Sequence, residues 1–572
     1  MILCPLFSFA QEFRAAAENG DAEAQTKMGN YHFEKKEYTQ ALEWYRKAEA
    51  QGNAEAMVQL AECYENGYGV TKDEKKGVEY EKKAAALGNA KAQSWLGNTY
   101  YKGYGGEQQD YAKAVEWYRK AAEQGNDWGQ YCLGVCYYDG KGVTQDYAKA
   151  VEWWRKAAEQ GDADAQTSLG ICYYLGEGVS KDYAKAVEWY RKAAEQGNAE
   201  GQYNLGVCYY NGKGVTKDYA KAVEWYTKAA EQGHAWGQYN LGICYYLGEG
   251  VSKDYAKAVE WWRKAAEQGH ATAQNDLGDC YYSGNGVTKD YAKAVEWWRK
   301  AAEQGNAGGQ YNLGNCYYNG EGVTKDYAKA VEWYTKAAEQ GNSNAQANLS
   351  RMYYTGKGVA QNDAVANEWY NKALKNGADK AWVIHSIGYG FFEQKNYAKA
   401  REWFMKGDVL SGYWAVSCAY WLAVMYRDGK GVQENLTKAK EYAQKAYDKD
   451  KSDSYNKELL DDINGRIQNH NENQAFYNNL VKKYGKANVD AVVFNHNVRV
   501  GMSIKLLMEC ANVILHEMRV FNGGADGQYK VEIIYEGTYR NEPGTFCKNY
   551  RIWVSNYKIT QFKEWTNADE RD

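Results

Sequence analysis

One stretch of this chain, DYAKAVEWYRKAAEQG, returns almost unchanged along most of its length. Its first residue recurs every 36 positions, at Asp110, Asp146, Asp182, Asp218, Asp254, Asp290 and Asp326. A fixed period of about 20 to 50 residues is typical of a solenoid, in which each unit leaves an apolar face that only its neighbours can cover. The period therefore predicts a scaffold of stacked copies of one small unit.

The unit at residues 198–233 predicts two helices, named helix A and helix B. Helix B starts at the acidic cap Asp218 and ends at Gly233, a residue suited to the left-handed position after a helix. One stripe of it is apolar, comprising Tyr219, Ala222, Val223, Tyr226, Ala229 and Ala230. Helix A spans 199–211, with Gly206 where its partner helix must come close. The loop Gly212-Lys213-Gly214-Val215 turns the chain between them.

The full motif is A-x-x-x-x-x-L-G-x-x-Y-x-x-G-x-G-V-x-x-D-x-x-K-A-x-x-W-Y-x-K-A-A-x-x-G. It resembles the Sel1-like repeat, a relative of the tetratricopeptide repeat, over residues 21–447 and about twelve units. The resemblance implies an all-α solenoid, a right-handed superhelix of stacked helix-turn-helix repeats. It also implies that helix A of each unit lines the inner, concave face of the superhelix.

Charge composition excludes two kinds of partner. The 70 Lys and Arg nearly balance the 74 Asp and Glu, so no strong field exists to attract nucleic acid or an anionic membrane. After the N-terminus no apolar run reaches the roughly 18 residues of a transmembrane helix. We therefore expect protein or peptide partners, no nucleic acid and no transmembrane segment; the oligomeric state stays open.

The N-terminal segment, residues 1–20, carries a hint of export. MILCPLFSFA, at residues 1–10, is a short apolar stretch with small residues at Ser8 and Ala10, as at the end of a secretory signal. It lacks the basic region that precedes such a stretch, so an ordinary apolar cap of the solenoid is the other interpretation. The sequence predicts an exported or periplasmic protein, with a cytoplasmic location as the alternative.

The cysteines of the repeat favour packing over chemistry. Seven of the chain's twelve form one column, Cys63, Cys136, Cys172, Cys208, Cys244, Cys280 and Cys316. Equivalent positions in stacked helices lie about 9 to 10 Å apart, whereas a disulfide needs Cα atoms within about 7 Å. We expect buried free thiols.

Catalytic signatures are missing from the sequence. The seven histidines make no H-E-x-x-H spacing, and no P-loop, G-x-S-x-G or Rossmann glycine motif occurs. The pairs His516 with Glu517 and Cys510 with Cys547 are the only suggestive neighbours, and both suit a structural role. The sequence predicts no catalytic residue, no cofactor and no metal site, and hence no enzyme.

Recognition is expected where helix A varies between copies. Helix B hardly changes, so its recurrent tryptophans are expected to pack, whereas four helix A columns are expected to face the groove. These columns are apolar and aromatic at first and turn polar from Thr272, through Asn275, Asp279 and Asn315. Exposed Trp and Tyr are frequent interface anchors, and Trp128 and Trp236 are the strongest candidates because most repeats have no tryptophan at this position.

The predicted partner-binding residues are Trp128, Tyr131, Tyr203, Trp236, Tyr239, Tyr311, Tyr138, Tyr210 and Tyr246. The last three belong to a constant tyrosine column, for which packing between helices is the favoured alternative.

Beyond the repeats, the sequence predicts a polar linker at residues 448–473 and a small α+β domain at residues 474–572. Helices are predicted over 475–485 and 503–518, and strands over 529–539 and 549–562, with a turn at Ser555-Asn556. The run Val500-Gly501-Met502-Ser503 is similar to small bacterial envelope proteins of the β-lactamase-inhibitor-like fold, over a few residues only. Such a domain would support export and protein binding.

We conclude from the sequence that this is a non-enzymatic scaffold or adaptor. It would bind a protein or peptide in the concave groove of the solenoid, with the C-terminal domain as a second docking module. Two alternatives remain. One is an enzyme or envelope-associated protein with activity in the C-terminal domain and the repeats as a platform, and the other is a structural spacer in the cell envelope.

Overall fold

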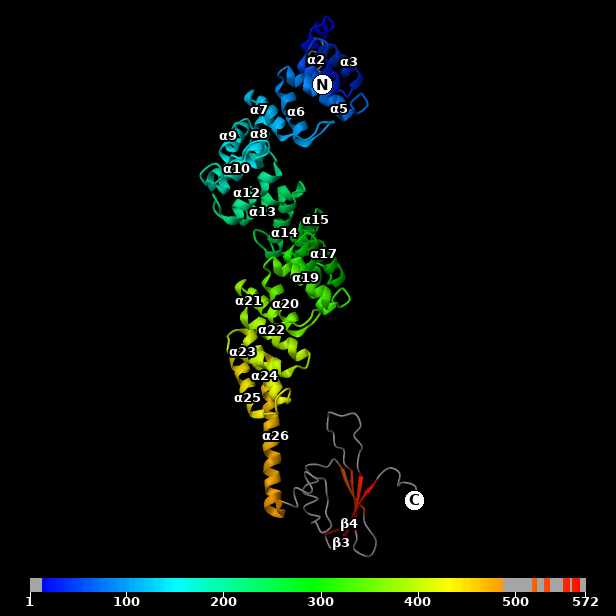
Figure 1. The fold of residues 1–572 in the computed structure, drawn as a ribbon, viewed down its shortest axis with the longest axis vertical. Coiled ribbons are helices and arrows are strands. Elements are labelled where there is room, and N and C mark those ends of the chain that lie inside the picture. The colour runs from blue at the N-terminus through cyan, green and yellow to red at the C-terminus, as the bar shows by residue number, and fades with distance from the viewer. Residues whose placement is uncertain (1–12, 487–516, 522–528, 535–548, 556–557, 566–572) are drawn as a thin grey trace. The chain divides into compact units, whose positions relative to one another are not determined.

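The fold was analysed in a computed structural model, which describes residues 13–486, 517–521, 529–534, 549–555 and 558–565 (Figure 1). The chain divides into two compact units, residues 1–340 and 341–572, which are described separately. Residues 1–12, with the predicted signal remnant, lie outside the described residues.

The first unit is built from pairs of helices of nearly constant length, each pair packing against the next along the chain. The A helices are α2 (Ala22–Glu34), α4 (Ala54–Asn66), α6 (Ala90–Lys102), α8 (Asp127–Asp139), α10 (Ala163–Leu175), α12 (Ala199–Asn211), α14 (Ala235–Leu247), α16 (Ala271–Ser283) and α18 (Ala307–Asn319). The B helices are α3 (Tyr38–Glu49), α5 (Glu74–Ala86), α7 (Tyr111–Glu123), α9 (Tyr147–Glu159), α11 (Tyr183–Glu195), α13 (Tyr219–Glu231), α15 (Tyr255–Glu267), α17 (Tyr291–Glu303) and α19 (Tyr327–Glu339). Stacked helix pairs, as the repeat predicted, make up this unit.

The predicted helix ends are confirmed. The Asp218 carboxylate accepts a hydrogen bond of 3.0 Å from the Lys221 backbone N–H and so starts α13. Gly233 follows the end of that helix with φ of 87°, a left-handed conformation that glycine adopts without strain. The repeat therefore sets its own helix boundaries through local rules.

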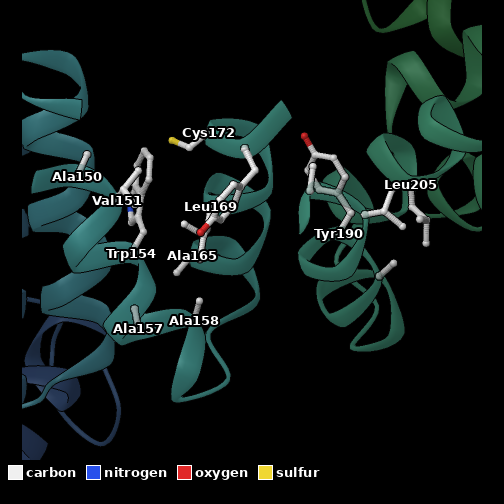
Figure 2. Packing of buried hydrophobic residues seen from close by; sticks show 14 of the residues in the cluster. Ala150, Val151, Trp154, Ala157, Ala158, Ala165, Leu169, Cys172, Tyr190 and Leu205 are labelled. Atoms are coloured by element: carbon white, nitrogen blue, oxygen red, sulfur yellow. The ribbon is translucent and has the colours of Figure 1, made fainter. Parts of the chain in front are cut away.

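The core lies between helices A and B and between successive pairs. Ala222, Val223, Tyr226, Ala229 and Ala230 are all buried, as the apolar stripe predicted. A Cβ placed on Gly206 would lie 2.7 Å from the Tyr226 ring, so only glycine allows this close approach. Figure 2 shows the same arrangement nearby, with side chains from α9, α10, α11 and α12 entering one shared core.

The cysteine column is buried and its thiols are free, as predicted. Burial raises the pKa of the Cys172 thiol to about 12, with a smaller contribution from Glu177. A thiol held neutral in this way is a poor nucleophile. The column therefore serves packing.

The helix B tryptophans pack against the core, as predicted, but they lie at its edge. The first aromatic of each Trp-Tyr or Trp-Trp pair, such as Trp225, is only half-buried, and its ring is covered by a lysine. The Lys228 Nζ lies 3.9 Å from the Trp225 ring centroid. The second aromatic, such as Tyr226 or Trp262, fills the core. A helix turns about 100° per residue, so the two adjacent rings point in different directions, and the second of them is the one that is fully buried.

A ladder of glutamine side chains joins successive repeats, and the sequence analysis did not foresee it. The buried Gln202 donates through Nε2 to the Ala194 carbonyl at 3.2 Å, and its Oε1 accepts from the Gln232 amide at 2.7 Å. The same pair of bonds recurs at Gln93, Gln130, Gln166, Gln238, Gln274 and Gln310. Each ladder step ties the end of helix B to the A helices on either side of it.

The repeat at α4 and α5 departs from this pattern by burying acids. Glu81 takes the place of the core aromatic, Glu65 that of the constant tyrosine and Thr99 that of the cysteine in the next helix A. The Thr99 hydroxyl donates to Glu81 Oε2 at 2.8 Å, whereas Glu65 Oε1 is buried without a hydrogen-bond partner. Burial, and then the charge of Glu81, raise the pKa of Glu65 to about 8.

This acid pair predicts a dependence of stability on pH. The folded protein holds a proton on Glu65 more tightly than the unfolded chain, whose ordinary pKa is 4.5. Its stabilising contribution is therefore complete below about pH 4.5 and is lost as the pH rises through about 8. Because Glu65 is partly solvent-accessible, we expect a loss of about 1 kcal/mol.

The variant Glu65→Gln isolates this effect. Its free energy of unfolding, measured in urea from pH 5 to pH 9, should fall less than that of the wild type across this interval. The exposed Glu231→Gln serves as the matched control and should follow the wild-type profile. Identical pH profiles for Glu65→Gln and the wild type would contradict the burial of an ionisable pair here.

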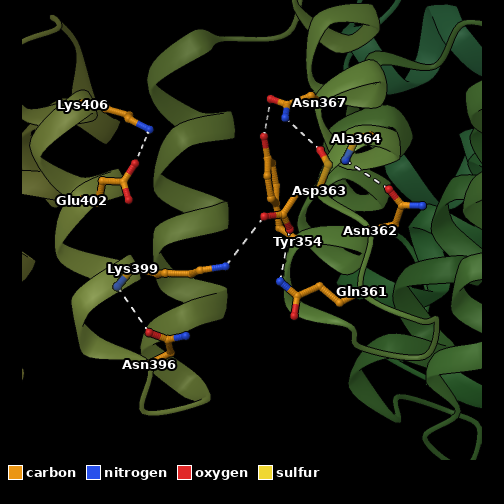
Figure 3. Close-up of polar contacts among 10 residues, drawn as sticks. All are labelled: Tyr354, Gln361, Asn362, Asp363, Ala364, Asn367, Asn396, Lys399, Glu402 and Lys406. Atoms are coloured by element: carbon orange, nitrogen blue, oxygen red, sulfur yellow. Dashed lines mark hydrogen bonds and ion pairs between the residues drawn. The ribbon is translucent and has the colours of Figure 1, made fainter.

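The second unit continues the helix pairs and adds a small sheet. Its helices are α20 (Ser343–Thr355), α21 (Asp363–Lys375), α22 (Lys380–Glu393), α23 (Tyr397–Asp408), α24 (Tyr413–Arg427), α25 (Leu436–Lys449) and α26 (Ser454–Tyr484). Polar contacts link neighbouring pairs, as where Lys399 Nζ of α23 lies 3.8 Å from the Asp363 carboxylate of α21 (Figure 3). Tyr354 donates its hydroxyl to Asn367 Oδ1 at 2.6 Å within the pair α20 and α21.

After the last helix pair, α26 covers residues 454–473 of the linker predicted at 448–473 and continues through the helix predicted at 475–485 as far as Tyr484. The strands β1 (Glu517–Phe521), β2 (Tyr529–Ile534), β3 (Asn549–Ser555) and β4 (Lys558–Trp565) form an antiparallel sheet in that order. The predicted strands at 529–539 and 549–562 are confirmed where residues are described.

The helix predicted over 503–518 is wrong at its end, because Glu517 and Met518 pair with β2. The rest of that helix, together with the segment Val500-Gly501-Met502-Ser503 and the turn residue Asn556, lies outside the described residues. So do Cys510, His516 and Cys547 of the suggestive neighbour pairs. In the part of the chain that the structure describes, every helix is too short or too polar to cross a lipid bilayer.

Candidate protein-binding surface

The predicted partner-binding residues all lie on A helices of the first unit. Trp128, Tyr131 and Tyr138 are on α8, Tyr203 and Tyr210 on α12, Trp236, Tyr239 and Tyr246 on α14, and Tyr311 on α18. Helix A of one pair contacts helix A of the next at α6 and α8, at α10 and α12, and at α16 and α18. We call the solvent-exposed side chains of the A helices of the first unit the helix A surface.

The two tryptophans are the largest uncovered side chains of this surface. Trp128 is 39% exposed and Trp236 is 51% exposed, although large aromatic rings are usually covered in a folded chain. The ring of Trp128 lies against Tyr131, with centroids 5.4 Å apart. Trp236 meets His270 edge to face at 4.3 Å. One side of each indole is thus in contact with a neighbouring ring, and the other side is exposed to solvent.

His270 supports Trp236 from the following repeat. It occupies the N-cap of α16, where α14 has His234 and the other A helices of this unit have Asn or Asp, and its Nδ1 accepts from the Ala273 N–H at 3.1 Å. Its ring also stacks on Tyr239, with centroids 4.7 Å apart. Burial lowers its pKa, so the ring is neutral near pH 7 and forms an aromatic cluster with Trp236 and Tyr239. A histidine at a cap position was the sequence signal for this cluster, and the sequence analysis overlooked it.

The tyrosines at the second column are half-buried and belong partly to the core. Tyr203 packs on Tyr226 with ring centroids 6.1 Å apart, and Tyr311 packs on Tyr334 at 6.0 Å. Burial raises the pKa of Tyr131 to about 12. These rings therefore offer an edge, rather than a whole face, to a partner.

The constant tyrosine column connects repeats. Tyr138 donates its hydroxyl to Glu177, in the loop of the next repeat, at 2.6 Å, and Tyr210 does the same to Glu249 at 2.5 Å. Tyr246 packs between the rings of Tyr255 and Trp262, with centroid distances of 4.9 and 5.2 Å. These contacts explain why the tyrosine recurs from α6 to α18.

A pocket of about 250 Å³ opens between α14, α15 and α16. Its lining combines aliphatic and aromatic side chains with two carboxylates: Ile243, Tyr246, Leu247, Trp262, Asp276, Asp279 and Cys280. Of the predicted partner-binding residues only Tyr246 is among them. Ile243 and Asp279 belong to one of the helix A columns that were predicted to face the groove. Asp276 belongs to none of these columns.

The two carboxylates are held by neutral donors. Asp276 accepts from the Tyr239 hydroxyl at 3.0 Å and from the Asn275 amide at 3.0 Å. Asp279 accepts from the Trp298 indole N–H at 2.9 Å and from the Asn312 amide at 3.0 Å. These donors come from α14, α16, α17 and α18, so three successive repeats fix the positions of the pair.

Burial perturbs both acids. It raises the pKa of Asp276, and burial followed by the neighbouring charge of Asp276 raises the pKa of Asp279 to about 6. Near pH 7 the pocket is therefore anionic. In α8, α10, α12, α14 and α18, an Asn, Ser or Cys and a Val, Ile or Asn occupy these two positions, as Asn240 with Ile243 does in α14.

One Ser–His contact deserves comparison with catalytic pairs. In the second unit, Ser417 Oγ lies 3.0 Å from His385 Nε2. The imidazole is packed among Trp414, Phe404 and Tyr389, and burial lowers its pKa to about 4. No carboxylate of the described residues hydrogen-bonds to His385, so the pair lacks the third group that orients a catalytic histidine.

Within the described ranges, no group of three or more His, Cys, Asp or Glu side chains is arranged to hold a metal ion. The two aspartates of the pocket are thus not accompanied by a third ligand of these types. A side chain or a ligand with a positive charge and an apolar part fits the pocket's lining better than a bare ion.

The sequence matches the model of the Sel1 repeat at residues 22–53, 54–89, 90–126, 129–162, 163–198, 199–234, 237–270, 271–306, 307–342, 343–377, 385–406 and 416–451. Among solved structures, the chain is similar to c5321, a protective antigen present in uropathogenic Escherichia coli strains displaying an SLR fold. The two share 34% identity over 86% of this chain and 98% of that one, with a TM-score of 0.56. A Sel1 repeat protein from Oxalobacter formigenes is 35% identical over 54% of this chain and 89% of its own, with a TM-score of 0.43. No curated protein matches this chain. From the repeat architecture and these similarities, the chain belongs to the Sel1 repeat family.

Proposed function

We propose that this protein is a non-enzymatic scaffold, which binds a segment of another protein on its helix A surface. The observation that carries the proposal is the pair of uncovered indoles, Trp128 and Trp236. The equivalent position holds Asp164, Glu200, Thr272 or Gly308 in other repeats, so the stack does not need a tryptophan there. A side chain that packing does not require, and that leaves a large apolar area in water, is typical of an interface anchor.

The surface around Trp236 is suited to a linear segment. Trp236, Tyr239, Ile243 and Tyr246 follow one another along one stripe of α14, at helical spacing. His270 and the two aspartates of α16 flank this stripe. A segment lying along α14 would contact an aromatic cluster at one end of the helix and the pocket at the other.

The variant Trp128→Ala/Trp236→Ala tests the proposal. Both side chains are uncovered on one side, so the fold should survive, at a cost of about 1 kcal/mol for each lost aromatic contact. Proteins that co-purify with the wild-type full chain from its source cells should be lost from the variant, whereas far-UV circular dichroism stays unchanged.

The matched control is Leu87→Ala/Met405→Ala, which removes two other exposed apolar side chains, 56% and 47% exposed, that lie at the end of α5 and on α23, outside the A helices. It should retain every partner. If both double variants recover the same proteins as the wild type, binding does not use the helix A surface.

We also propose that the protein is exported, with residues 474–572 as a second docking module. The apolar run at residues 1–10 supports export, and the similar c5321 is described as a protective antigen. The antiparallel sheet of β1 to β4 supports a separate module. Fractionation of cells that express the native gene tests export: recovery in the cytoplasm alone would contradict it. Partner recovery by a chain ending at residue 485, equal to that of the full chain, would contradict the docking role.

A further inference from the structure

The pocket between α14 and α16 carries two carboxylates without a positive charge beside them, Asp276 being half-buried and Asp279 exposed to solvent. Among the described residues, no lysine, arginine or histidine forms an ion pair with Asp276 or Asp279, and no cation contributes to their electrostatic surroundings. The hydrogen-bond donors that reach them are a phenol, an indole and two side-chain amides, all neutral.

Such an arrangement leaves the negative charge of the pocket without a counter-charge among the described residues. Each carboxylate disfavours the charged form of the other, and neutral hydrogen-bond donors do not balance that repulsion. Raised pKa values of carboxyl groups at a concave site, together with convergent polar groups, are typical of binding sites rather than of packing. The missing component is a positive charge that arrives from outside the chain.

We propose that this pocket receives the cationic side chain, lysine or arginine, of the protein segment bound by the helix A surface. This inference rests on the function proposed above and names the chemistry of the partner at one position. The aliphatic stem of the side chain lies against Ile243 and Leu247, and its charged head reaches the two aspartates. The rings of Tyr246 and Trp262 add cation–π attraction, which is strongest for desolvated cations.

The size of the pocket agrees with a single side chain. Its volume of about 250 Å³ lies below the range of roughly 300 to 1,000 Å³ that is usual for small-molecule sites. A lysine or arginine carries both parts that this lining requires, an apolar stem and a charged head.

The distance to Trp236 predicts a pattern in the partner. Ile243, at the pocket, follows Trp236 by seven residues on α14, which corresponds to about 10 Å along the helix axis. An extended chain covers this distance in about three residues. The partner segment should therefore carry an apolar side chain for Trp236 and a cationic one about three positions away.

The experiment is a selection of random peptides displayed on phage, carried out in parallel on the full chain and on Asp276→Asn/Asp279→Asn. This variant removes both charges and keeps the shape of the side chains. The chain itself provides the precedent for its folding, because α18 has Asn312 and Asn315 at the equivalent positions. The control Glu231→Gln/Glu267→Gln removes two exposed charges of α13 and α15 and keeps the pocket intact.

We expect peptides enriched on the wild type and on the control to share a lysine or arginine at a fixed distance from an apolar residue. Replacing that residue in a synthetic peptide, arginine by citrulline or lysine by norleucine, should weaken binding at least about tenfold by calorimetry. The same replacement should cause no further loss on Asp276→Asn/Asp279→Asn.

Two outcomes would overturn the inference, and they differ in what else they reject. Enriched peptides that need Trp128 or Trp236 but tolerate citrulline or norleucine would reject the cationic pocket and leave the scaffold function intact. No enriched peptide whose binding depends on either tryptophan would reject the function proposed for the helix A surface, and the pocket assignment with it.

Discussion

Replacing Gly214 with alanine should lower the free energy of unfolding of the first unit by about 2 to 5 kcal/mol. Gly214 is the second glycine of its loop, with φ of 72°, and a Cβ there would overlap the Tyr183 carbonyl at the start of α11. The left-handed conformation costs a side chain about 1 to 2 kcal/mol. The overlap with fixed backbone costs about 1 to 3 kcal/mol more, because the preceding repeat must move away.

Gly212→Ala provides the matched control for this prediction. Gly212 has nearly the same φ, 70°, but a Cβ there would meet Lys217 without overlap, at 3.1 Å from its Cβ and 3.4 Å from its backbone N. Urea unfolding, followed by circular dichroism, should show a loss of about 1 to 2 kcal/mol for Gly212→Ala and a clearly larger loss for Gly214→Ala. Equal losses would show that the loop does not pack on the preceding repeat.

Replacing Gln202 with leucine should lower the free energy of unfolding by about 2 kcal/mol, even though leucine is similar in size and more apolar. The substitution removes two buried hydrogen bonds, to the Ala194 carbonyl and from the Gln232 amide. Each is worth about 1 kcal/mol net. Apolar gain cannot compensate fully, because the side chain is already buried in the native protein.

Gln232→Leu separates the two bonds of this ladder step. Gln232 is exposed, so its loss removes one bond and leaves Gln202 its contact with Ala194. We expect a loss below about 1 kcal/mol, measured as the shift of the urea midpoint at constant slope. A Gln202→Leu protein as stable as the wild type would mean that the ladder does not contribute to the stacking of repeats.

The helices and their ends could be predicted from the sequence because they depend on local rules. Asp218 at an N-cap and Gly233 after a helix act through their own backbone, and the 36-residue period repeats these signals. The apolar stripe from Ala222 to Ala230 was equally readable, since burial of one helix face follows from its periodicity.

Other features depend on contacts between repeats, which the pattern within one repeat does not show. Gln202 is polar and would ordinarily be placed in solvent, yet two repeats enclose it. The choice between Trp225 and Tyr226 as the core aromatic depends on the angle at which two helices pack. The strand at Glu517 and Met518 replaces a predicted helix end because pairing with β2 outweighs local helix preference.

The candidate site was predictable in part. Helix A variation pointed to Trp128 and Trp236, and the structure leaves both uncovered. The pocket was not foreseen, because it needs Asp276 and Asp279 to face Ile243 and Tyr246 of the preceding repeat. The sequence shows that Asn240 and Ile243 of one repeat are replaced by two aspartates in the next. It does not show which side chains of the neighbouring repeat these aspartates contact, so the pocket could not be predicted.

The central claim is that partners bind the helix A surface, and photo-crosslinking in the source cells tests it most directly. A photoreactive phenylalanine analogue is placed in the full chain at position 128, 236 or 247 on helix A, or at the exposed positions 224 and 260 on helix B. We predict a shared covalent adduct with another protein from the helix A positions and none from helix B. Adducts from the helix B positions alone, or from none of the positions, would contradict the account.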